Sequence, residues 1–456
     1  MSAPLPAAVE QILTSHNLDF QVQIIASDNF ANVQTTLFRD NQGALQVFYP
    51  AGSLLNLEAL QSLTDRQLKP LNQTDVEALC QTKQLQNAPS VPMALGVDIV
   101  IDNHLLEEQA LRLNTGDEQS IVELGNAQFK ALTANAISGD LSICESLLQS
   151  TQLDGAQDVD DITQAVANFT QLRIKNRLEE TLEFPPLPET AQEIIKLRVN
   201  PDADISDLTK IVEKDPALAA QVVSWAASPY YAAPGKIKSV HDAIVRVLGF
   251  DLVMNLALGL ALGKTLNMPK ESAKGFTPYW DQSVYAAAAM EALVRAIPPK
   301  QRPSMGMAYL SGLLHNFGYL ILAEVFPPHF ANICRYQEAN PYSNHTYIER
   351  HLLGVTREQL GAWLMRLWSM PEEVCTALRF QNQPSFEDEN YEYANLMVIA
   401  MRLLRSHGIG DAPLDPIPAE TYERLHLSEE KAKEAIDNLM ESAADLNIIA
   451  REMAGE

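Results

Sequence analysis

Cysteine is scarce in this sequence of 456 residues. The 4 cysteines lie far apart and form no Cys-x-x-Cys motif; they are Cys80, Cys144, Cys334 and Cys375. Without short, regular cysteine spacing, neither a disulfide framework nor a structural zinc site is expected. We expect each cysteine to be a small, buried apolar side chain.

Basic residues are few relative to acidic ones. There are 33 Lys and Arg residues against 58 Asp and Glu residues, which gives a formal net charge of −25. Binding to nucleic acid through phosphate neutralisation needs a basic excess, so we expect no DNA partner. A large net charge of one sign keeps a protein dispersed in solution, and this favours a cytoplasmic location.

Long apolar runs and phosphate-binding loops are also missing. The longest apolar run, around Leu252–Leu262, is shorter than the 20 or so residues of a membrane span. The N-terminus has no charged region followed by a hydrophobic run, so we expect no secretory signal and no membrane partner. Gly-Lys occurs twice without the preceding glycines of a phosphate loop, and we expect no cofactor.

The first part of the sequence predicts an α+β domain. Phe20, Val22 and Ile24 alternate with polar residues, as in a half-buried strand. Val33–Phe38 and Leu45–Phe48 flank the turn sequence DNQG, so a β-hairpin is expected there. With the helical patterns between such strands, these elements predict helices on an antiparallel or mixed sheet.

Three stretches of residues 1–133 carry a family resemblance: VQTTLFRDNQGALQVFYPAG, VPMALGVDIVIDNHLL and LNTGDEQSIVELGNAQFKAL. They resemble the YbaK/prolyl-tRNA editing type of deacylase. In that family a lysine before the strand Thr-Leu contacts the tRNA end or its aminoacyl group, whereas Gln34 and Thr35 stand there in this chain. The glycine-rich substrate loop reads NAPS at residues 87–90 and lacks the glycines that allow close backbone approach. The resemblance therefore implies a degenerate deacylase-like domain, kept for sensing or for contacts.

Residues 134–172 are predicted to be a linker followed by a connecting helix. The linker carries an acidic patch of Asp154, Asp158, Asp160 and Asp161. Charge runs usually lie in solvent, so we expect a solvated connector. Apolar residues then recur at helical spacing and predict a helix that packs on the next domain; they are Ile162, Val166, Phe169 and Leu172.

The middle of the sequence predicts three consecutive helices. Asp215-Pro216 combines a strong N-cap with a residue that fits the first helical position. Ser239 begins the next helix with a near capping box, and Gly249 is the expected left-handed residue at its end. Leu252–Leu262 is apolar almost all round, so that helix is expected to be buried on every side.

Three motifs in this order also carry a resemblance: FPPLPETAQEIIKL, IVEKDPALAAQVVSWAASPYY and SVHDAIVRVLGFDLV. They resemble the HDOD domain, an HD-related output domain of bacterial signalling proteins. The resemblance runs from about Arg173 to the C-terminus and implies an all-α domain over residues 173–456 with a regulatory or protein-binding role. The predicted fold is thus multi-domain, with an α+β domain followed by an all-α HDOD domain.

The HD phosphohydrolases, which this fold resembles, hold divalent metals with histidines and aspartates, and the metal activates a water. The surrounding motifs locate the corresponding positions here; they hold Gln282, His315-Asn316, Arg357, Gln381-Asn382 and Met401. One histidine is kept, and Arg357 would repel a cation. We therefore expect no bound metal and a remnant polar pocket. Such a pocket could bind a small anion or nucleotide, or its polar groups could bond to one another.

These observations predict a non-enzymatic signal-transduction protein that acts through protein contacts or ligand sensing. Its expected partners are other proteins, signalling proteins among them. Two enzymatic alternatives remain open. One is a metal-dependent phosphohydrolase or phosphodiesterase of the HD type, and the other is an aminoacyl-tRNA trans-editing deacylase.

Overall fold

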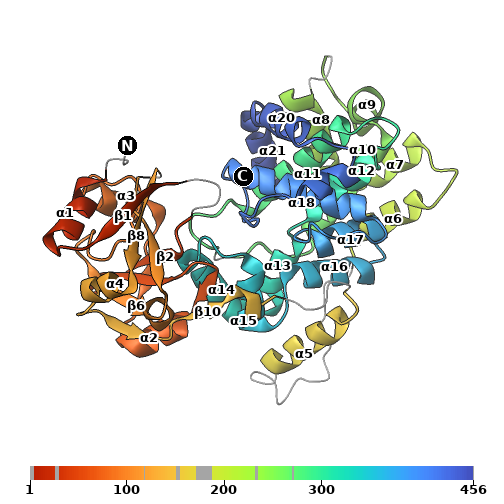
Figure 1. The fold of residues 1–456 in the computed structure, drawn as a ribbon. Helices are drawn as coiled ribbons and strands as arrows, with labels where there is room; N and C mark the ends of the chain where they lie inside the picture. The colour runs from red at the N-terminus through yellow and green to blue at the C-terminus, as the bar shows by residue number, and fades with distance from the viewer. Residues whose placement is uncertain are drawn as a thin grey trace. The chain divides into compact units, whose positions relative to one another are not determined.

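The computed structural model describes residues 5–25, 30–117, 119–149, 155–170, 187–231, 235–269 and 272–454. The chain divides into two compact units. The N-terminal unit comprises Met1–Ser150, Glu271–Gly275 and Ala331–Ser343; the helical unit comprises Thr151–Lys270, Phe276–Phe330 and Asn344–Glu456. The first contains a mixed sheet with helices and the second is built of helices, so the predicted fold class is confirmed (Figure 1).

Three sheets form the framework of the N-terminal unit. They have the strand orders β5-β2-β3-β6-β9, β1-β8-β7 and β10-β4. The strands are β1 (Phe20–Ile24), β2 (Val33–Asp40), β3 (Gly43–Pro50), β4 (Ser53–Leu55), β5 (Lys69–Pro70), β6 (Asp98–Asp102), β7 (Ala110–Asn114), β8 (Ser120–Gly125), β9 (Ile137–Gly139) and β10 (Ser142–Cys144). The helices are α1 (Ala7–Ser15), α2 (Leu57–Thr64), α3 (Gln73–Gln81) and α4 (Asn126–Leu132), with 3₁₀ turns η1 (Asn103–Leu106) and η2 (Glu145–Leu147). β2 pairs antiparallel with β3, whereas β3 and β6 pair in parallel, so the largest sheet is mixed.

The predicted hairpin is confirmed. β2 and β3 pair in register from Val33 opposite Pro50 to Asp40 opposite Gly43. The Asp40 carboxylate accepts the Gln42 N–H at 2.8 Å. Gly43 has a φ of 129°, which only glycine adopts readily. The turn residues therefore close the hairpin by local chemistry.

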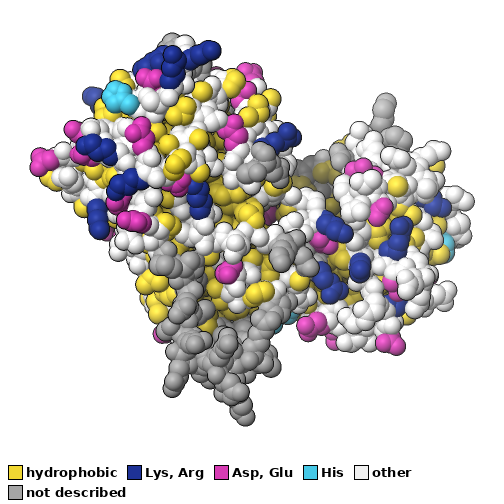
Figure 2. Space-filling view, turned by 180° about the vertical axis from the view of Figure 1, so that it is seen from behind, with side chains coloured by type: hydrophobic (Ala, Val, Ile, Leu, Met, Phe, Trp, Pro, Cys, Tyr) yellow, Lys and Arg dark blue, Asp and Glu magenta, His cyan; other side chains and the backbone are white. Residues whose placement is uncertain are grey.

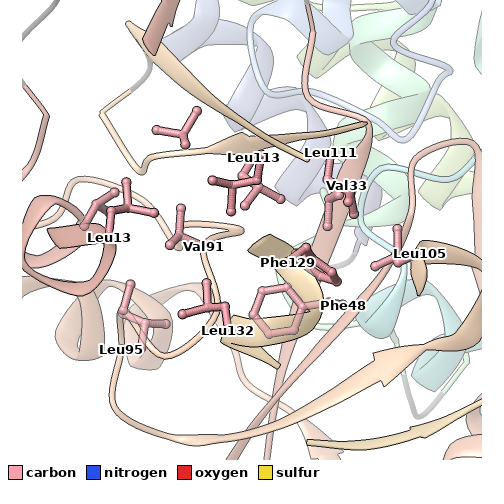
Figure 3. Close-up of a cluster of buried hydrophobic side chains, with 14 of the residues drawn as sticks. Leu13, Val33, Phe48, Val91, Leu95, Leu105, Leu111, Leu113, Phe129 and Leu132 are labelled. Atoms are coloured by element: carbon pink, nitrogen blue, oxygen red, sulfur yellow. The ribbon is translucent and has the colours of Figure 1, made fainter. Parts of the chain in front are cut away.

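An apolar core joins the sheets and helices of this unit (Figure 3). Phe48 from β3, Leu111 from β7 and Phe129 from α4 are all fully buried in it. Full burial of a large apolar side chain stabilises a protein by about 1.5–3 kcal/mol. These contacts, from elements far apart in the sequence, therefore hold the sheets together.

Two strands lie in the part of the chain that was predicted to be a linker. β9 pairs in parallel with β6, and β10 pairs antiparallel with β4. Each strand has three residues, which is too short for alternation to show in the sequence. The linker prediction is therefore wrong for residues 137–139 and 142–144, while the domain boundaries at residues 133 and 173 stay predictions.

Residues Ala331–Ser343 complete the N-terminal unit although they follow its sheets far along the sequence. Ala339 is fully buried in a second apolar cluster of this unit. The Asn340 side chain accepts the Leu55 N–H at 2.7 Å and donates to the Leu55 carbonyl oxygen at 3.3 Å. Residues 1–150 alone would therefore lack part of their own core.

Helices make up the helical unit. They are α5 (Asp158–Thr170), α6 (Glu189–Arg198), α7 (Ile205–Glu213), α8 (Pro216–Ala227), α9 (Val240–Ala243), α10 (Phe250–Gly263), α11 (Tyr279–Ala296), α12 (Met305–Leu314), α13 (Phe317–Val325), α15 (His345–Leu353), α16 (Arg357–Leu367), α17 (Glu372–Phe380), α18 (Tyr391–Ser406), α19 (Ala419–Arg424), α20 (Glu429–Met440) and α21 (Ala443–Ala454), with the short turns η3 (Pro229–Tyr231) and η4 (Ile244–Leu248). α14 (Pro327–Ala339) has residues in both units. α11 packs against α12, α18, α20 and α21 and is the central helix of the unit.

The predicted N-caps are confirmed. The Asp215 carboxylate accepts the Ala217 N–H at 3.0 Å, and the Ser239 hydroxyl accepts the Asp242 N–H at 3.1 Å. Gly249 ends η4 with the positive φ of 80° that favours glycine, but its ψ of 169° differs from that of the expected left-handed cap. The sequence pattern did not predict that η4 is a π-helical turn. α10 is buried on every side from Val253 to Leu262, as expected.

Two segments with continuous helical patterning are each divided into two helices. Ala308–Val325 is divided between α12 and α13 at His315-Asn316, where Asn316 has φ −100° and ψ 18°. The C-terminal segment from Ser428 is divided into α20 and α21. Helical spacing is similar on both sides of each break, so periodicity alone could not locate them.

Three of the four cysteines follow the prediction, and the surface carries charges of both signs (Figure 2). Among the described residues, no helix is long and apolar enough to cross a bilayer. On the face shown in Figure 2, basic side chains stand singly or in small groups among acidic and apolar ones. Cys80, Cys334 and Cys375 are buried as expected, whereas Cys144 in β10 is exposed, which corrects that prediction.

Candidate functional site

The residues that the resemblance assigns to the HD ligand positions come together in the helical unit. His315-Asn316 joins α12 to α13, and Arg357 is the first residue of α16. Six of the seven predicted pocket residues line one cavity: His315, Asn316, Arg357, Gln381, Asn382 and Met401. The seventh, Gln282 of α11, accepts a hydrogen bond from the Asn316 amide at 3.2 Å.

Arg357 is the centre of this site. Its side chain is 3% exposed. Its Nε donates to Glu349 at 2.5 Å, and its Nη1 donates to Asp411 at 3.0 Å and to Asn316 at 3.3 Å. Thr356 and Gln359 form a capping box that begins α16, so local sequence fixes the position of Arg357 at the helix start.

Glu349 binds Arg357 at two places. Besides the guanidinium, it accepts the Arg357 backbone N–H at 2.8 Å, where a carboxylate is favoured by the helix dipole. Burial raises the pKa of Glu349 although Arg357 opposes that shift. Burial opposes the charge of Arg357 too, but Glu349 and Asp411 raise the pKa of its guanidinium further above its ordinary value, so it remains a cation.

His345 is the second cation of the site. Its Nε2 lies 2.6 Å from Glu358, and its Nδ1 lies 3.5 Å from Asp411. Burial and Arg357 lower its pKa, but Asp411 and Glu358 outweigh them and raise it to about 9. Burial also raises the pKa of Glu358, yet His345 and Arg357 lower it to about 2. His345 and Glu358 therefore form a buried ion pair at neutral pH.

His315 is neutral in contrast. It is 4% exposed, and its Nδ1 lies 2.8 Å from the Gly312 carbonyl oxygen, so Nδ1 carries the hydrogen. Burial lowers the pKa of His315 to about 4. Gln381 donates to the His315 carbonyl oxygen at 3.0 Å and fixes this turn of the chain. His315 is thus a hydrogen-bonded core histidine that also lines the cavity.

The cavity is too small for a nucleotide. The space open to the centre of a water molecule is about 10 Å³, which corresponds to roughly one water. Two of the polar atoms of its lining residues, Arg357 Nη2 and Glu358 Oε2, make no hydrogen bond with the described residues. The site can therefore accept one small hydrogen-bonding molecule without a change in side-chain positions.

The charges around the cavity do not favour an anion. Two cations, Arg357 and His345, face three carboxylates. The guanidinium that could have received a phosphate is already bound by Glu349 and Asp411. An added anion would lie beside these three carboxylates, whose negative charges oppose its binding.

The residues do not fit the divalent metal of an HD hydrolase. Among the described residues, no group of three or more His, Cys, Asp and Glu side chains is arranged to hold a metal ion. The carboxylates nearby already bind Arg357 and His345. A cation at this place would lie beside the Arg357 guanidinium, which supplies a fixed positive charge there.

Sequence reasoning missed the four charged residues that surround Arg357. They are His345, Glu349, Glu358 and Asp411. Asp411 is in the chain after α18, whereas the others belong to α15 and α16. The only local signal was the capping-box pattern Thr356-x-x-Gln359, which places Arg357 at a helix start. The pairing across helices has no spacing signature.

The acidic patch of the predicted connector is also placed differently. Asp158 is 5% exposed and binds Arg379 of α17 through Nε at 2.5 Å and Nη2 at 2.9 Å. Gln359 donates to Asp158 at 2.9 Å and to Asp161 at 3.2 Å. The expectation of a solvated patch is therefore wrong for Asp158, because a buried arginine pairs with it; Asp154 lies outside the described residues.

The candidate deacylase residues belong to β2. Gln34 and Thr35 are half-buried, and the Thr35 hydroxyl donates to the Val47 carbonyl oxygen at 3.0 Å. The loop of residues 87–90 is bound to the β7–β8 turn, since the Asn87 N–H donates to Gly116 O at 3.0 Å and the Ser90 N–H donates to Asn114 O at 2.9 Å. These loop N–H groups are therefore already used within the fold.

Comparison with known proteins shows similarity to the HDOD family and to a solved structure that matches along nearly the whole chain. The family model of the HDOD domain matches residues 184–384. The crystal structure of a proposed signal transduction protein from Marinobacter aquaeolei VT8 is 40% identical, with a TM-score of 0.91, over 99% of this chain and 100% of that chain.

Two further matches cover part of the chain. An uncharacterised protein of Treponema pallidum (strain Nichols) is 22% identical over 249 residues, which are 55% of this chain and 47% of that protein. This chain thus matches about half the length of that curated relative. The crystal structure of a proposed trans-editing enzyme for prolyl-tRNA synthetase matches 31% of this chain and 99% of that chain, at 16% identity and a TM-score of 0.27.

Proposed function

We propose that this chain, which belongs to the HDOD family, is a signalling protein that acts through contacts with other proteins and catalyses no reaction in its helical unit. The observation that carries the proposal is the position of Arg357. A guanidinium with 3% exposure, bound by Glu349 and Asp411, stands where HD hydrolases place a metal ligand.

Hydrolysis of the HD type needs a cation that activates water. In this chain the positive charge comes from a guanidinium, which stays protonated in a protein and does not coordinate a water molecule as a metal ion does. His315 is the remaining ligand type, and its Nδ1 is engaged with the Gly312 carbonyl oxygen. The site therefore supports stability and shape better than it supports bond breaking.

A role in signalling is supported by the relative from Marinobacter aquaeolei VT8, which carries a proposed signal-transduction function and matches over nearly the whole chain at 40% identity. A fold alone does not define a function, but here the similarity includes both units. The cavity of about 10 Å³ argues against nucleotide sensing at this site. Protein contact is thus the form of output that the helical unit best supports.

Residual deacylase activity is not part of the proposal. The loop amides that would approach a substrate donate to Gly116 O and Asn114 O, and the position of the family's lysine holds Gln34-Thr35. Hydrolysis of aminoacyl-tRNA should be measured with the full chain, since residues 331–343 complete the N-terminal unit. We expect no turnover above the buffer rate.

The main test is a hydrolysis assay of the full-length protein with bis(p-nitrophenyl) phosphate and manganese, together with a measurement of bound metal. We expect the buffer rate, and far less than one metal ion per chain, for the wild type and for His315→Ala. Turnover or stoichiometric metal that His315→Ala removes would overturn the proposal. Cross-linking in cells should trap the same protein partners with the wild type and with His315→Ala, because binding to a partner requires no catalysis at His315.

A further inference from the structure

Helix α5 is attached to the helical unit through a buried charge pair (α5 lies beside α16 in Figure 1). Asp158, at the start of α5, binds the Arg379 guanidinium with both carboxylate oxygens, at 2.5 and 2.9 Å. Arg379 is 4% exposed. Such a two-oxygen contact is the strong and geometrically specific form of an arginine–carboxylate pair.

The surface that receives α5 is organised by the helical unit itself. Gln359 of α16 accepts the Thr356 N–H at 3.0 Å through its side-chain oxygen, which leaves its amide N–H groups to donate to Asp158 and Asp161. The Arg379 guanidinium lies over the Phe380 ring, 5.1 Å from its centroid. Gln359 and Arg379, which we call the carboxylate seat, are therefore held in place by contacts that do not involve α5.

The described apolar part of the α5 contact includes two buried side chains. Ile162 and Ala165 are buried, at 4% and 2% exposure, and they share one helix face with Asp158 and Asp161. Val159, on another face of the same helix, is 58% exposed. α5 thus contributes two carboxylates three residues apart, followed by a short apolar stripe.

Removal of Asp158 would leave Arg379 buried without a counter-charge, which is strongly unfavourable. The carboxylate seat therefore requires an acidic side chain, whichever helix supplies it. An interface that needs one defined carboxylate is specific, and a competing helix with the same pattern of carboxylates and apolar residues can replace the one that is bound.

We infer that the carboxylate seat is a docking site for an acidic amphipathic helix of a partner protein and that α5 occupies it in the free protein. The partner helix would carry two carboxylates three residues apart, followed by apolar residues at the positions of Ile162 and Ala165. This inference rests on the proposed function, since it names the surface and the kind of partner for output through protein contacts.

The test uses full-length chains and a fluorescent peptide with the sequence of residues 155–170. Asp158→Arg should repel Arg379 and release α5, so this chain should bind the peptide at least tenfold more tightly than the wild type, whose seat is filled. Asp160→Arg is the matched control, because Asp160 is exposed on the same helix. It should bind the peptide no better than the wild type does.

Charge reversal on the other side gives a second, independent arm. Arg379→Asp should fail to bind the unmodified peptide and should bind a peptide that carries Asp158→Arg. This exchange of peptide specificity would identify position 158 of the peptide and position 379 of the chain as the interacting pair, even if Asp158→Arg lowers the melting temperature of the chain. Absence of peptide binding to both reversed chains, with helical circular dichroism preserved, would refute the docking site. That result would leave the hydrolysis assay, and with it the absence of catalysis, untouched.

Discussion

Replacement of Arg357 by methionine should destabilise the helical unit by about 3–5 kcal/mol, the usual cost of removing one partner from a buried ion pair. Three features of the structure place the expected cost in the upper part of this range. Arg357 is 3% exposed, its Nε–Glu349 contact is 2.5 Å, and Glu349 itself is completely buried. Methionine has a similar length and leaves little cavity. The decrease in the free energy of unfolding therefore comes mainly from Glu349 and Asp411, which lose their positive partner.

Tryptophan fluorescence can follow this unit alone. All 4 tryptophans, Trp225, Trp280, Trp363 and Trp368, lie in the helical unit. A loss of this size should lower its melting temperature by about 6–15 °C. Arg366→Met is the matched control on the same helix, because Arg366 is 40% exposed and pairs with an exposed Glu372. An exposed pair contributes about 0–1 kcal/mol, so the control should shift the melting temperature by less than about 3 °C.

The effect should depend on pH in a defined direction. Burial raises the pKa of Glu349, and loss of Arg357 raises it further, so Glu349 takes up a proton in the variant as the pH falls. The difference between Arg357→Met and wild type should therefore be largest near pH 8 and smaller near pH 5. Equal shifts for Arg357→Met and Arg366→Met at pH 8 would refute the view that Arg357 is the central charge of the site.

Three other predictions concern single contacts. For His345→Gln, the pKa of about 9 for His345 in the folded protein exceeds its unfolded value of about 6.5. The wild type should therefore be more stable than the variant by the full amount below pH 6.5, and this difference should disappear as the pH rises through 9. Fluorescence melts at pH 6, 8 and 10 would show this, and a constant difference would contradict it. For Gly318→Ala, the added Cβ would overlap the Arg357 carbonyl oxygen, so α13 and α16 must separate at a cost of about 3 kcal/mol. Gly361→Ala, whose added Cβ would have its nearest neighbour at 3.2 Å, should cost less in the same melt, and the reverse order would show that the helices separate easily. For Asn340→Ala, loss of both hydrogen bonds to Leu55 should destabilise the N-terminal unit by about 1–3 kcal/mol and speed hydrogen exchange at the Leu55 amide. Unchanged exchange would mean that another group accepts a hydrogen bond from this amide of β4.

Predictions from local sequence succeeded where the determining atoms are neighbours in the chain. The hairpin of β2 and β3 follows from the turn residues Asp40 and Gly43, and the starts of α8 and α9 follow from Asp215 and Ser239. In each case a side chain bonds to a backbone group two or three residues away. Such contacts form without help from the rest of the fold.

The candidate site was predicted in part for another reason. The family resemblance located seven positions, and the structure brings six of them around one cavity. The resemblance could not show that Glu349 and Asp411 balance the positive charge of Arg357, because these residues come from separate elements and no periodicity links them. Asp158 was misjudged in the same way, since its partner Arg379 lies on a distant helix.

The sequence by itself determined the two kinds of fold and their order, because caps and periodicity act over a few residues, whereas the absence of metal-binding side chains was only what the family resemblance implied. Only the tertiary structure decided which carboxylate meets which cation, how small the cavity is, and that residues 331–343 complete the N-terminal unit. The reason is physical. Burial gives a charge its pKa and its need for a partner, and burial is a property of the packed chain rather than of any segment.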